Sequence, residues 1–367
     1  MSMTALVLLL DIGSAGVRAA LTRGAEILWQ ESALLPFQSE LELERFLAGV
    51  VETLKTVVES AAAKGDGPPA EIVVALGAPF YAAQIQTLER RAETDFVVSE
   101  KLIRELVAQG LAGIQAQENE ILESSVLTIL TNGYAVLDPD GQKVKTLTLK
   151  HYASAAPTKI LTRLGAVLAA RWPGVRPRWH SLTFVTFRAL DILDPQATDY
   201  LLFDFGGETS ELSLVWRDSL KASVSFPLGQ NWLARQLSSA LHLGPPALES
   251  VLTLWRGKPP SPTGPSGTPG GLTPEAERAL TDAARGARAG WFQIFHQALR
   301  QVSEGAIIPE RLYLLGDAPT VPLVAEWLAS EPVPSLVRQH PGFKLKLLSS
   351  PLLVLKTFYD KILSKRD

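Results

Sequence analysis

The chain has 367 residues, of which 46% are hydrophobic and 20% are charged, and its formal net charge is −3. This length allows two or more lobes with separate cores, and a slightly acidic chain without a basic stripe is not expected to bind nucleic acid. The sequence contains no cysteine, which excludes a disulfide framework, a zinc ribbon and a thiol nucleophile and suits a cytoplasmic protein.

The first part of the chain begins with an apolar hairpin that has an acidic tip. Residues 6–21 run as an apolar strand, an aspartate, a glycine turn and a second apolar strand, which places Asp11, Gly13 and Ser14 at the tip. A third strand, a long amphipathic helix and a short buried strand are predicted next, at residues 31–37, 41–64 and 71–76. The order β-β-β-α-β predicts one lobe over residues 1–78.

Residues 79–180 differ in character and predict a separate small α+β subdomain inserted in the first lobe. Periodicity predicts strands at residues 84–91, 125–130 and 146–152 and helices at residues 99–109 and 158–170. The sequences Asn132-Gly133-Tyr134 and Asp138-Pro139-Asp140-Gly141 are typical of turns between strands.

Residues 181–199 are expected to return the chain to the first lobe, as a strand over residues 181–186 followed by a helix. Residues 200–367 then form the second lobe, which opens with another glycine hairpin. Further helices are predicted at residues 230–241, 274–303, 321–329 and 352–363, and strands at residues 311–315 and 343–348. Residues 258–271 are almost all Pro, Gly, Ser or Thr, which predicts a flexible loop in this lobe.

The second hairpin has the same build as the first one. Its tip carries Asp204, Gly206, Gly207 and Thr209. Glycines at such a tip let backbone N–H groups approach phosphate oxygens. Two hairpins that face each other could therefore clasp a polyphosphate, with Mg²⁺ held between the two aspartates.

The order of elements and three motifs resemble the actin-like ATPase superfamily, and within it the FtsA and PilM branch of bacterial actin homologues. The segments around Asp11 and Asp204 look like its two phosphate loops, and Leu314-Leu315-Gly316-Asp317-Ala318 is similar to its adenosine motif. The insertion after residue 76, with its two turn sequences, looks more like the FtsA version. The resemblance implies an α/β fold with two lobes, a duplicated ribonuclease-H-like fold, and a small inserted α+β subdomain.

The resemblance also implies ATP and Mg²⁺ as ligands between the lobes. Asp11 and Asp204 would hold Mg²⁺ through water. The residues expected to contact the nucleotide itself are Gly13, Ser14, Gly206, Gly207 and Thr209 at the phosphates and Gly316 at the nucleoside. Arg18, on the second strand of the first hairpin, would either carry positive charge toward the phosphates or be a solvated charge at the sheet edge.

Several residues depart from the pattern of the superfamily. Glu208 replaces a glycine in the second phosphate loop, and Asp317 replaces the second glycine of the adenosine motif. Ser250 and Thr253 stand where a Glu-x-x-Lys pair often flanks the adenine. The predicted strand at residues 181–186 offers no carboxylate or amide to position an attacking water. These departures favour nucleotide binding over hydrolysis, so at most a weak ATPase is expected.

The function implied by the resemblance is a bacterial actin-like nucleotide-binding scaffold similar to FtsA, in cell division or another membrane-associated assembly. Its partners would be copies of itself or a tubulin-like division protein. A PilM-like role is the nearest alternative, as a cytoplasmic platform of type IV pilus assembly that captures a peptide of a pilus membrane protein. The pattern also leaves open a pseudo-ATPase that serves interaction alone and a small-molecule kinase on the same fold. No convincing catalytic base for a kinase is found.

The last predicted helix bears on where the protein acts. Residues 352–363 place apolar side chains on one face and lysines on the other, a pattern that suits both a packing helix and a helix on a membrane surface. The short distance from the last strand favours a packing helix of the second lobe. We therefore expect a cytoplasmic protein, with peripheral contact at the inner face of the cell membrane as the alternative.

Overall fold

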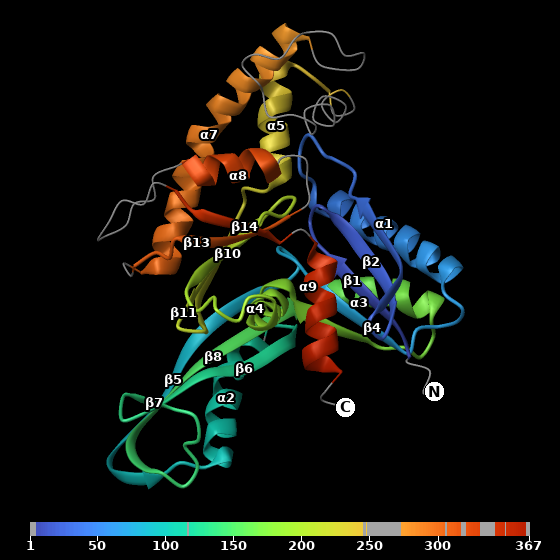
Figure 1. Ribbon diagram of the computed structural model, residues 1–367. Coiled ribbons are helices and arrows are strands. Elements are labelled where there is room, and N and C mark those ends of the chain that lie inside the picture. Colours follow the sequence, from blue (N-terminus) through green and yellow to red (C-terminus); the bar gives the residue numbers. More distant parts are fainter. Residues whose placement is uncertain are drawn as a thin grey trace.

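The structure is a computed structural model that describes residues 5–115, 117–244, 247, 273–304, 307–316, 321–330, 342–348 and 350–364. The predicted loop at residues 258–271 and the residues Ser250, Thr253, Asp317 and Ala318 lie outside the described residues. Two five-stranded sheets with the same internal order make two lobes, and a third sheet projects from the first lobe (Figure 1). The predicted α/β fold with two lobes of the same build and an additional sheet is thereby confirmed.

The sheet of the first lobe has the strand order β3-β2-β1-β4-β9. These strands are β1 (Leu6–Ile12), β2 (Gly16–Arg23), β3 (Glu26–Leu34), β4 (Glu71–Leu76) and β9 (Pro177–Ser181). Every residue of β1 is buried, as expected of a central strand that is covered on both faces. Helices α1 (Leu43–Lys64) and α3 (Thr158–Arg171) pack on one face of this sheet and form a single apolar core with it.

The sheet of the second lobe repeats this order as β12-β11-β10-β13-β14. Its strands are β10 (Tyr200–Asp204), β11 (Ser210–Trp216), β12 (Ser219–Phe226), β13 (Arg311–Leu315) and β14 (Lys344–Leu348). Helices α5 (Gln230–Leu241), α7 (Pro274–Ser303) and α8 (Val321–Ser330) cover its outer face (Figure 1). Helix α7 begins where Thr273 accepts a hydrogen bond from the Ala276 N–H and Pro274 occupies the first turn.

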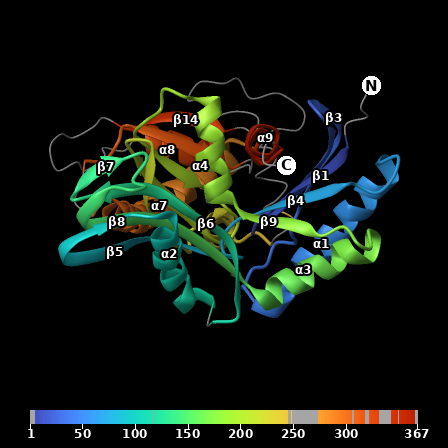
Figure 2. The same ribbon diagram turned by 90° about the horizontal axis from the view of Figure 1, so that it is seen from below.

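The third sheet is inserted between β4 and α3 and has the order β5-β8-β6-β7. Its strands are β5 (Ala82–Val97), β6 (Asn119–Thr131), β7 (Tyr134–Val136) and β8 (Lys143–Pro157), and α2 (Glu100–Gln115) packs on one of its faces. Figure 2 shows α3 beside α1, away from this sheet. Because α3 and β9 join the core and the sheet of the first lobe, we propose that the inserted subdomain covers residues 82–157. The division of the remaining chain into lobes stays a prediction.

Two helices lie between the lobes and share one apolar core with both sheets. They are α4 (Leu182–Leu193) and α9 (Pro351–Phe358), the latter followed by a turn of π-helix (Tyr359–Leu363). The apolar face of α9 is buried there, as a packing helix requires, but it packs on α4, β1 and β2 rather than on the second lobe alone. In the described part of the chain, no helix has the length and apolar character needed to cross a bilayer.

The strand predicted over residues 181–186 is wrong. Strand β9 pairs with β4 and ends at Ser181, and α4 begins at Leu182. Helix α4 is buried on most of its circumference because it lies between two sheets, so its sequence lacks the amphipathic period of a surface helix. The β-branched and aromatic residues at its start then imitate a buried strand.

Candidate functional site

The tips of the two glycine hairpins meet between the lobes. The first tip connects β1 to β2 and is closed by a hydrogen bond of 3.0 Å from the Gly13 N–H to the Gly16 carbonyl oxygen. The second tip connects β10 to β11, and its Glu208 N–H donates to Ser14 Oγ at 3.0 Å. The structure thus brings the predicted phosphate loops together, although these two residues are 194 positions apart.

The two tips pack backbone against backbone, which explains the need for glycine at Gly207. A Cβ atom added there would lie 2.2 Å from the carbonyl oxygen of Ser14 and 2.5 Å from the nitrogen of Ala15. Gly229, before α5, supports the same tip from its other side, since its Cβ would lie 2.1 Å from the Gly207 carbonyl oxygen. Contacts this short are not found between real side chains and backbone, so only glycine permits this approach.

The side chain of Glu208 is buried beside the tips, with a residue exposure of 7%. It pairs with Arg235 of α5, whose Nη2 lies 2.5 Å from Oε2, and it accepts a hydrogen bond of 2.8 Å from Asn231 Nδ2. Arg235 Nη1 also donates to the carbonyl oxygen of Gln38, in the loop between β3 and α1, at 3.2 Å. Glu208 departs from the sequence pattern of the superfamily. Its carboxylate is held by two donors of its own lobe and is linked to the first lobe through Arg235.

Asp11 and Arg18 form a buried ion pair on facing positions of β1 and β2. Arg18 Nη1 lies 2.7 Å from Asp11 Oδ2, and the exposed fractions of the two side chains are 9% for Arg18 and 1% for Asp11. The interpretation of Arg18 as a solvated charge is therefore wrong. Its guanidinium compensates the charge of Asp11, and a role toward phosphates stays a prediction.

The remaining predicted site residues lie along the ends of neighbouring strands. Asp204 ends β10, is half-buried, and faces Glu211 of β11 and Leu315 of β13 in the strand register. Gly316 follows β13 directly and has a φ of 145°, a conformation that glycine adopts readily. Thr209 is half-buried at the second tip. Asp204 and Gly316 thus lie close together at the carboxyl ends of two paired strands, and their role toward a nucleotide stays a prediction.

These contacts test whether the described residues fit ATP and Mg²⁺. A phosphate loop binds through backbone N–H groups that point at the ligand, whereas the N–H groups of Gly13 and Glu208 donate within the protein. No phosphate can lie between Ser14 and Gly207 while the tips touch. In the described ranges, no three His, Asp or Glu residues are grouped to hold a metal ion. This arrangement does not fit a polyphosphate clasped between the tips.

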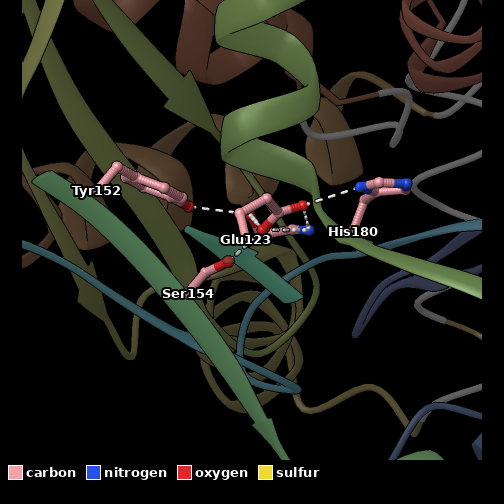
Figure 3. A network of polar contacts seen from close by, with 5 residues as sticks. Glu123, Tyr152, Ser154 and His180 are labelled. Atoms are coloured by element: carbon pink, nitrogen blue, oxygen red, sulfur yellow. Dashed lines mark hydrogen bonds and ion pairs between the residues drawn. The ribbon is translucent and has the colours of Figure 1, made fainter. Parts of the chain in front are cut away.

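A buried polar network centred on Glu123 joins the third sheet to the first lobe (Figure 3). Glu123 Oε1 lies 3.0 Å from His180 Nδ1, and the carboxylate accepts hydrogen bonds from the Ser181 N–H at 3.0 Å and from Ser181 Oγ at 2.7 Å. Ser154 Oγ donates to the same carboxylate, and Tyr152 bonds to Ser181 Oγ at 2.8 Å. Because Ser181 precedes α4, the negative charge of Glu123 lies at a helix N-terminus, where it is favourable.

Sequence reasoning missed this network. The strand predicted over residues 125–130 began after Glu123, and a single glutamate in an alternating strand is usually solvent-exposed. Its burial arises from tertiary packing, because β6 passes the start of α4. The sequence gives no local signal for this polar joint, because its members come from three separate strands, β6, β8 and β9.

A second buried carboxylate links the two lobes directly. Glu211 of β11 is 3% exposed and accepts hydrogen bonds from Tyr81 Oη at 2.5 Å and from Ser223 Oγ at 2.6 Å. Burial, together with the nearby charge of Glu211, raises the pKa of Tyr81 well above its ordinary value. The hydroxyl of Tyr81 therefore stays protonated and donates to the second lobe.

Tyr81 also lines a groove of about 610 Å³ on the third sheet. The floor consists of residues on one face of β5 and β8, among them Ala82, Gln84 and Ala155, and one wall is the last part of α2. Nearly half of the lining residues are alanine or glycine, and their small side chains leave this space open. The described residues that line the groove include no Asp, Glu, Lys or Arg.

Beside the groove, His151 of β8 makes the stability depend on pH. His151 is fully buried, its Nε2 bonds to Ser124 Oγ at 2.8 Å, and burial lowers its pKa below the ordinary 6.5. In the unfolded chain His151 therefore binds a proton near pH 6.5, whereas in the folded chain it binds one only at lower pH. As a result, the free energy of unfolding falls as the pH drops below 6.5. For one such group the slope is at most about 1.4 kcal/mol per pH unit.

This expectation is measured by urea unfolding between pH 7.5 and pH 5.5, with the variant His151→Gln as the reference. The wild type should lose more stability than the variant over this interval, because the remaining titrating groups affect both proteins equally. Equal losses would contradict a role for His151.

Comparison with known proteins identifies the fold. No family model and no curated protein sequence matches the chain. Among solved structures, the PilM–PilN type IV pilus biogenesis complex matches with a TM-score of 0.61 and 16% sequence identity, over 95% of this chain and 89% of that chain. A likeness at this identity establishes the fold alone.

Two further structures match with lower TM-scores. The ethanolamine utilization protein EutJ from Carboxydothermus hydrogenoformans gives 0.46 at 11% identity, over 96% of this chain and 87% of that one. MreB 5 of Spiroplasma citri, bound to AMPPNP, gives 0.45 at 11% identity, over 99% of this chain and 98% of that one.

Proposed function

We propose that this chain is a bacterial actin-like scaffold that acts as a cytoplasmic platform for a pilus-type membrane protein. The groove on the third sheet carries the proposal, because it offers a preformed site for an extended segment of a partner. The likeness of the whole chain to the fold in the PilM–PilN complex supports it. The sequence motifs alone left this role as the alternative to cell division, and the groove favours it.

The chemistry of the groove defines the segment that it would bind. Its described lining is uncharged, with amide groups from Gln84, Gln117 and Asn119 among alanines, glycines and prolines. A charged side chain buried there would lose its hydration without gaining an ionic partner. We therefore expect an uncharged segment with apolar side chains, held in register by a few hydrogen bonds. A volume of about 610 Å³ is in the range of protein ligand sites.

A larger side chain at one position of the groove wall should block the groove without disturbing the fold. Gly113 lies on α2, is exposed, lines the groove, and has no atom within 4 Å of where its Cβ would be. The variant Gly113→Phe should therefore place a ring in the groove while improving the helix propensity of α2. We expect it to raise the Kd for the segment at least about tenfold, equivalent to about 1.4 kcal/mol.

The measurement is fluorescence anisotropy with a labelled peptide from the cytoplasmic segment of the PilN homologue in the organism that encodes this chain. The matched control is Ala108→Phe, which places the same ring at an exposed position of α2 that does not line the groove. Binding to the wild type and the control but not to Gly113→Phe supports the platform. No binding to the wild type, or equal binding to all three proteins, contradicts it.

The division role and the nucleotide ligands have less support from the geometry of the site. Cell division with a tubulin-like partner, self-assembly and contact with the membrane face stay predictions. ATP and Mg²⁺ also stay predictions, and they would require the hairpin tips to separate. A pseudo-ATPase that serves interaction alone is favoured by one observation, the burial of Glu208 against Arg235 beside the tips.

A further inference from the structure

Three contacts at and near the hairpin tips join the two lobes. The Glu208 N–H of the second lobe donates to Ser14 Oγ of the first, and Arg235 Nη1 of the second donates to the Gln38 carbonyl oxygen of the first. Phe37, next to Gln38, packs against the apolar core of the second lobe. The lobes are therefore closed by the protein's own groups.

Glu208 and Arg235 hold these contacts in place. Arg235 engages both carboxylate oxygens, with Nη2 at 2.5 Å from Oε2 and Nη1 at 3.3 Å from Oε1. Such a paired geometry fixes the guanidinium more firmly than one hydrogen bond does. With the guanidinium fixed, Nη1 also reaches the Gln38 carbonyl oxygen. The ion pair inside the second lobe therefore orients the N–H group that donates to the first lobe.

We propose that Ser14, Gln38, Glu208 and Arg235 form an interlobe latch that holds the lobes closed without a bound phosphate. In a nucleotide-dependent clasp, an anion between the tips would join the lobes. Here the lobes are joined without such an anion, because Gly207 packs against the backbone of Ser14 and the Glu208 carboxylate beside the second tip is paired with Arg235. The closed arrangement of the lobes is thus independent of MgATP.

This inference goes beyond the platform role, since it concerns closure of the lobes and not the groove. The test is the distance between spin labels on the two lobes, measured by double electron–electron resonance. The chain has no cysteine, so the substitutions Glu59→Cys on α1 and Ala289→Cys on α7, both at exposed positions, give two specific labelling sites. Peptide binding to the groove is measured separately, so failure of either proposal can be told from failure of the other.

The wild type is expected to give one narrow distance distribution that excess MgATP does not shift. Glu208→Ala and Arg235→Ala should give longer and broader distributions. Ser14→Ala, which removes one hydroxyl group, should show the same change to a smaller degree. If circular dichroism shows that the first two variants fold poorly, this third variant replaces them in the test. Arg285→Ala is the control, because Arg285 forms an exposed ion pair with Asp282 on the same helix as one label.

Two results would overturn the latch. A shift of the wild-type distribution by MgATP would show that nucleotide sets the closure. Distributions of the folded variants that coincide with the wild type would show that these four residues do not hold the lobes together.

Discussion

The substitution Gly207→Ala is expected to lower the free energy of unfolding by about 2–3 kcal/mol. The added Cβ would lie 2.2 Å from the Ser14 carbonyl oxygen and 2.3 Å from its carbonyl carbon. Both are backbone atoms that no side-chain rotation can move. The tips would have to separate, which breaks the hydrogen bond from the Glu208 N–H to Ser14 Oγ.

The effect is measured by urea unfolding followed by tryptophan fluorescence. The matched control is Gly286→Ala on α7, since no atom lies within 4 Å of its added Cβ. In a helix this change should stabilise the protein by about 0.5–1 kcal/mol. If Gly207→Ala unfolds at the same urea concentration as the wild type, the two tips do not pack backbone against backbone.

Glu123→Ala is expected to lower the free energy of unfolding by about 3–5 kcal/mol. The substitution removes the acceptor for the Ser181 N–H, Ser181 Oγ and Ser154 Oγ, and it removes the partner of His180 Nδ1. These groups lie in the interior, where water cannot easily replace the lost hydrogen bonds. The start of α4 also loses the negative charge that offsets its dipole.

The same unfolding experiment tests this variant, with Glu120→Ala as its control. Glu120 lies on the same strand but is exposed, so its replacement should change the stability by no more than about 0.5 kcal/mol. Similar effects of the two substitutions would show that the Glu123 network does not join the third sheet to the first lobe.

The fold could be predicted from the sequence where one local signal dominates. The helix predicted over residues 274–303 agrees with α7, which has a threonine cap, a proline in its first turn and a regular apolar face. The strand predicted over residues 311–315 agrees with β13, which is short and almost entirely buried. Helix α4 was partly misread because it is apolar on most sides, and periodicity then cannot separate a buried helix from a buried strand.

The candidate site, like the fold, could be predicted from the sequence only in part. The position of the hairpin tips follows from Asp11, Asp204 and the glycines, which a local pattern reveals. The state of the tips depends on contacts between distant segments, such as Glu208 with Arg235 and Ser14 with the second tip. A sequence does not show which charge will neutralise Glu208, so the same residue fits both a damaged phosphate loop and a latch.

The position of α9 has a consequence for how the protein is made. Val7 and Leu9 of β1 are covered by a core that includes Leu355 and Phe358, and Lys356 Nζ bonds to the Gly24 carbonyl oxygen at 3.1 Å. A ribosome that adds roughly 5–20 residues per second releases β1 tens of seconds before α9. During that time the nascent first sheet exposes an apolar face that only later-synthesised residues can cover. The packing of the first sheet is therefore completed only late in synthesis, once α9 has emerged.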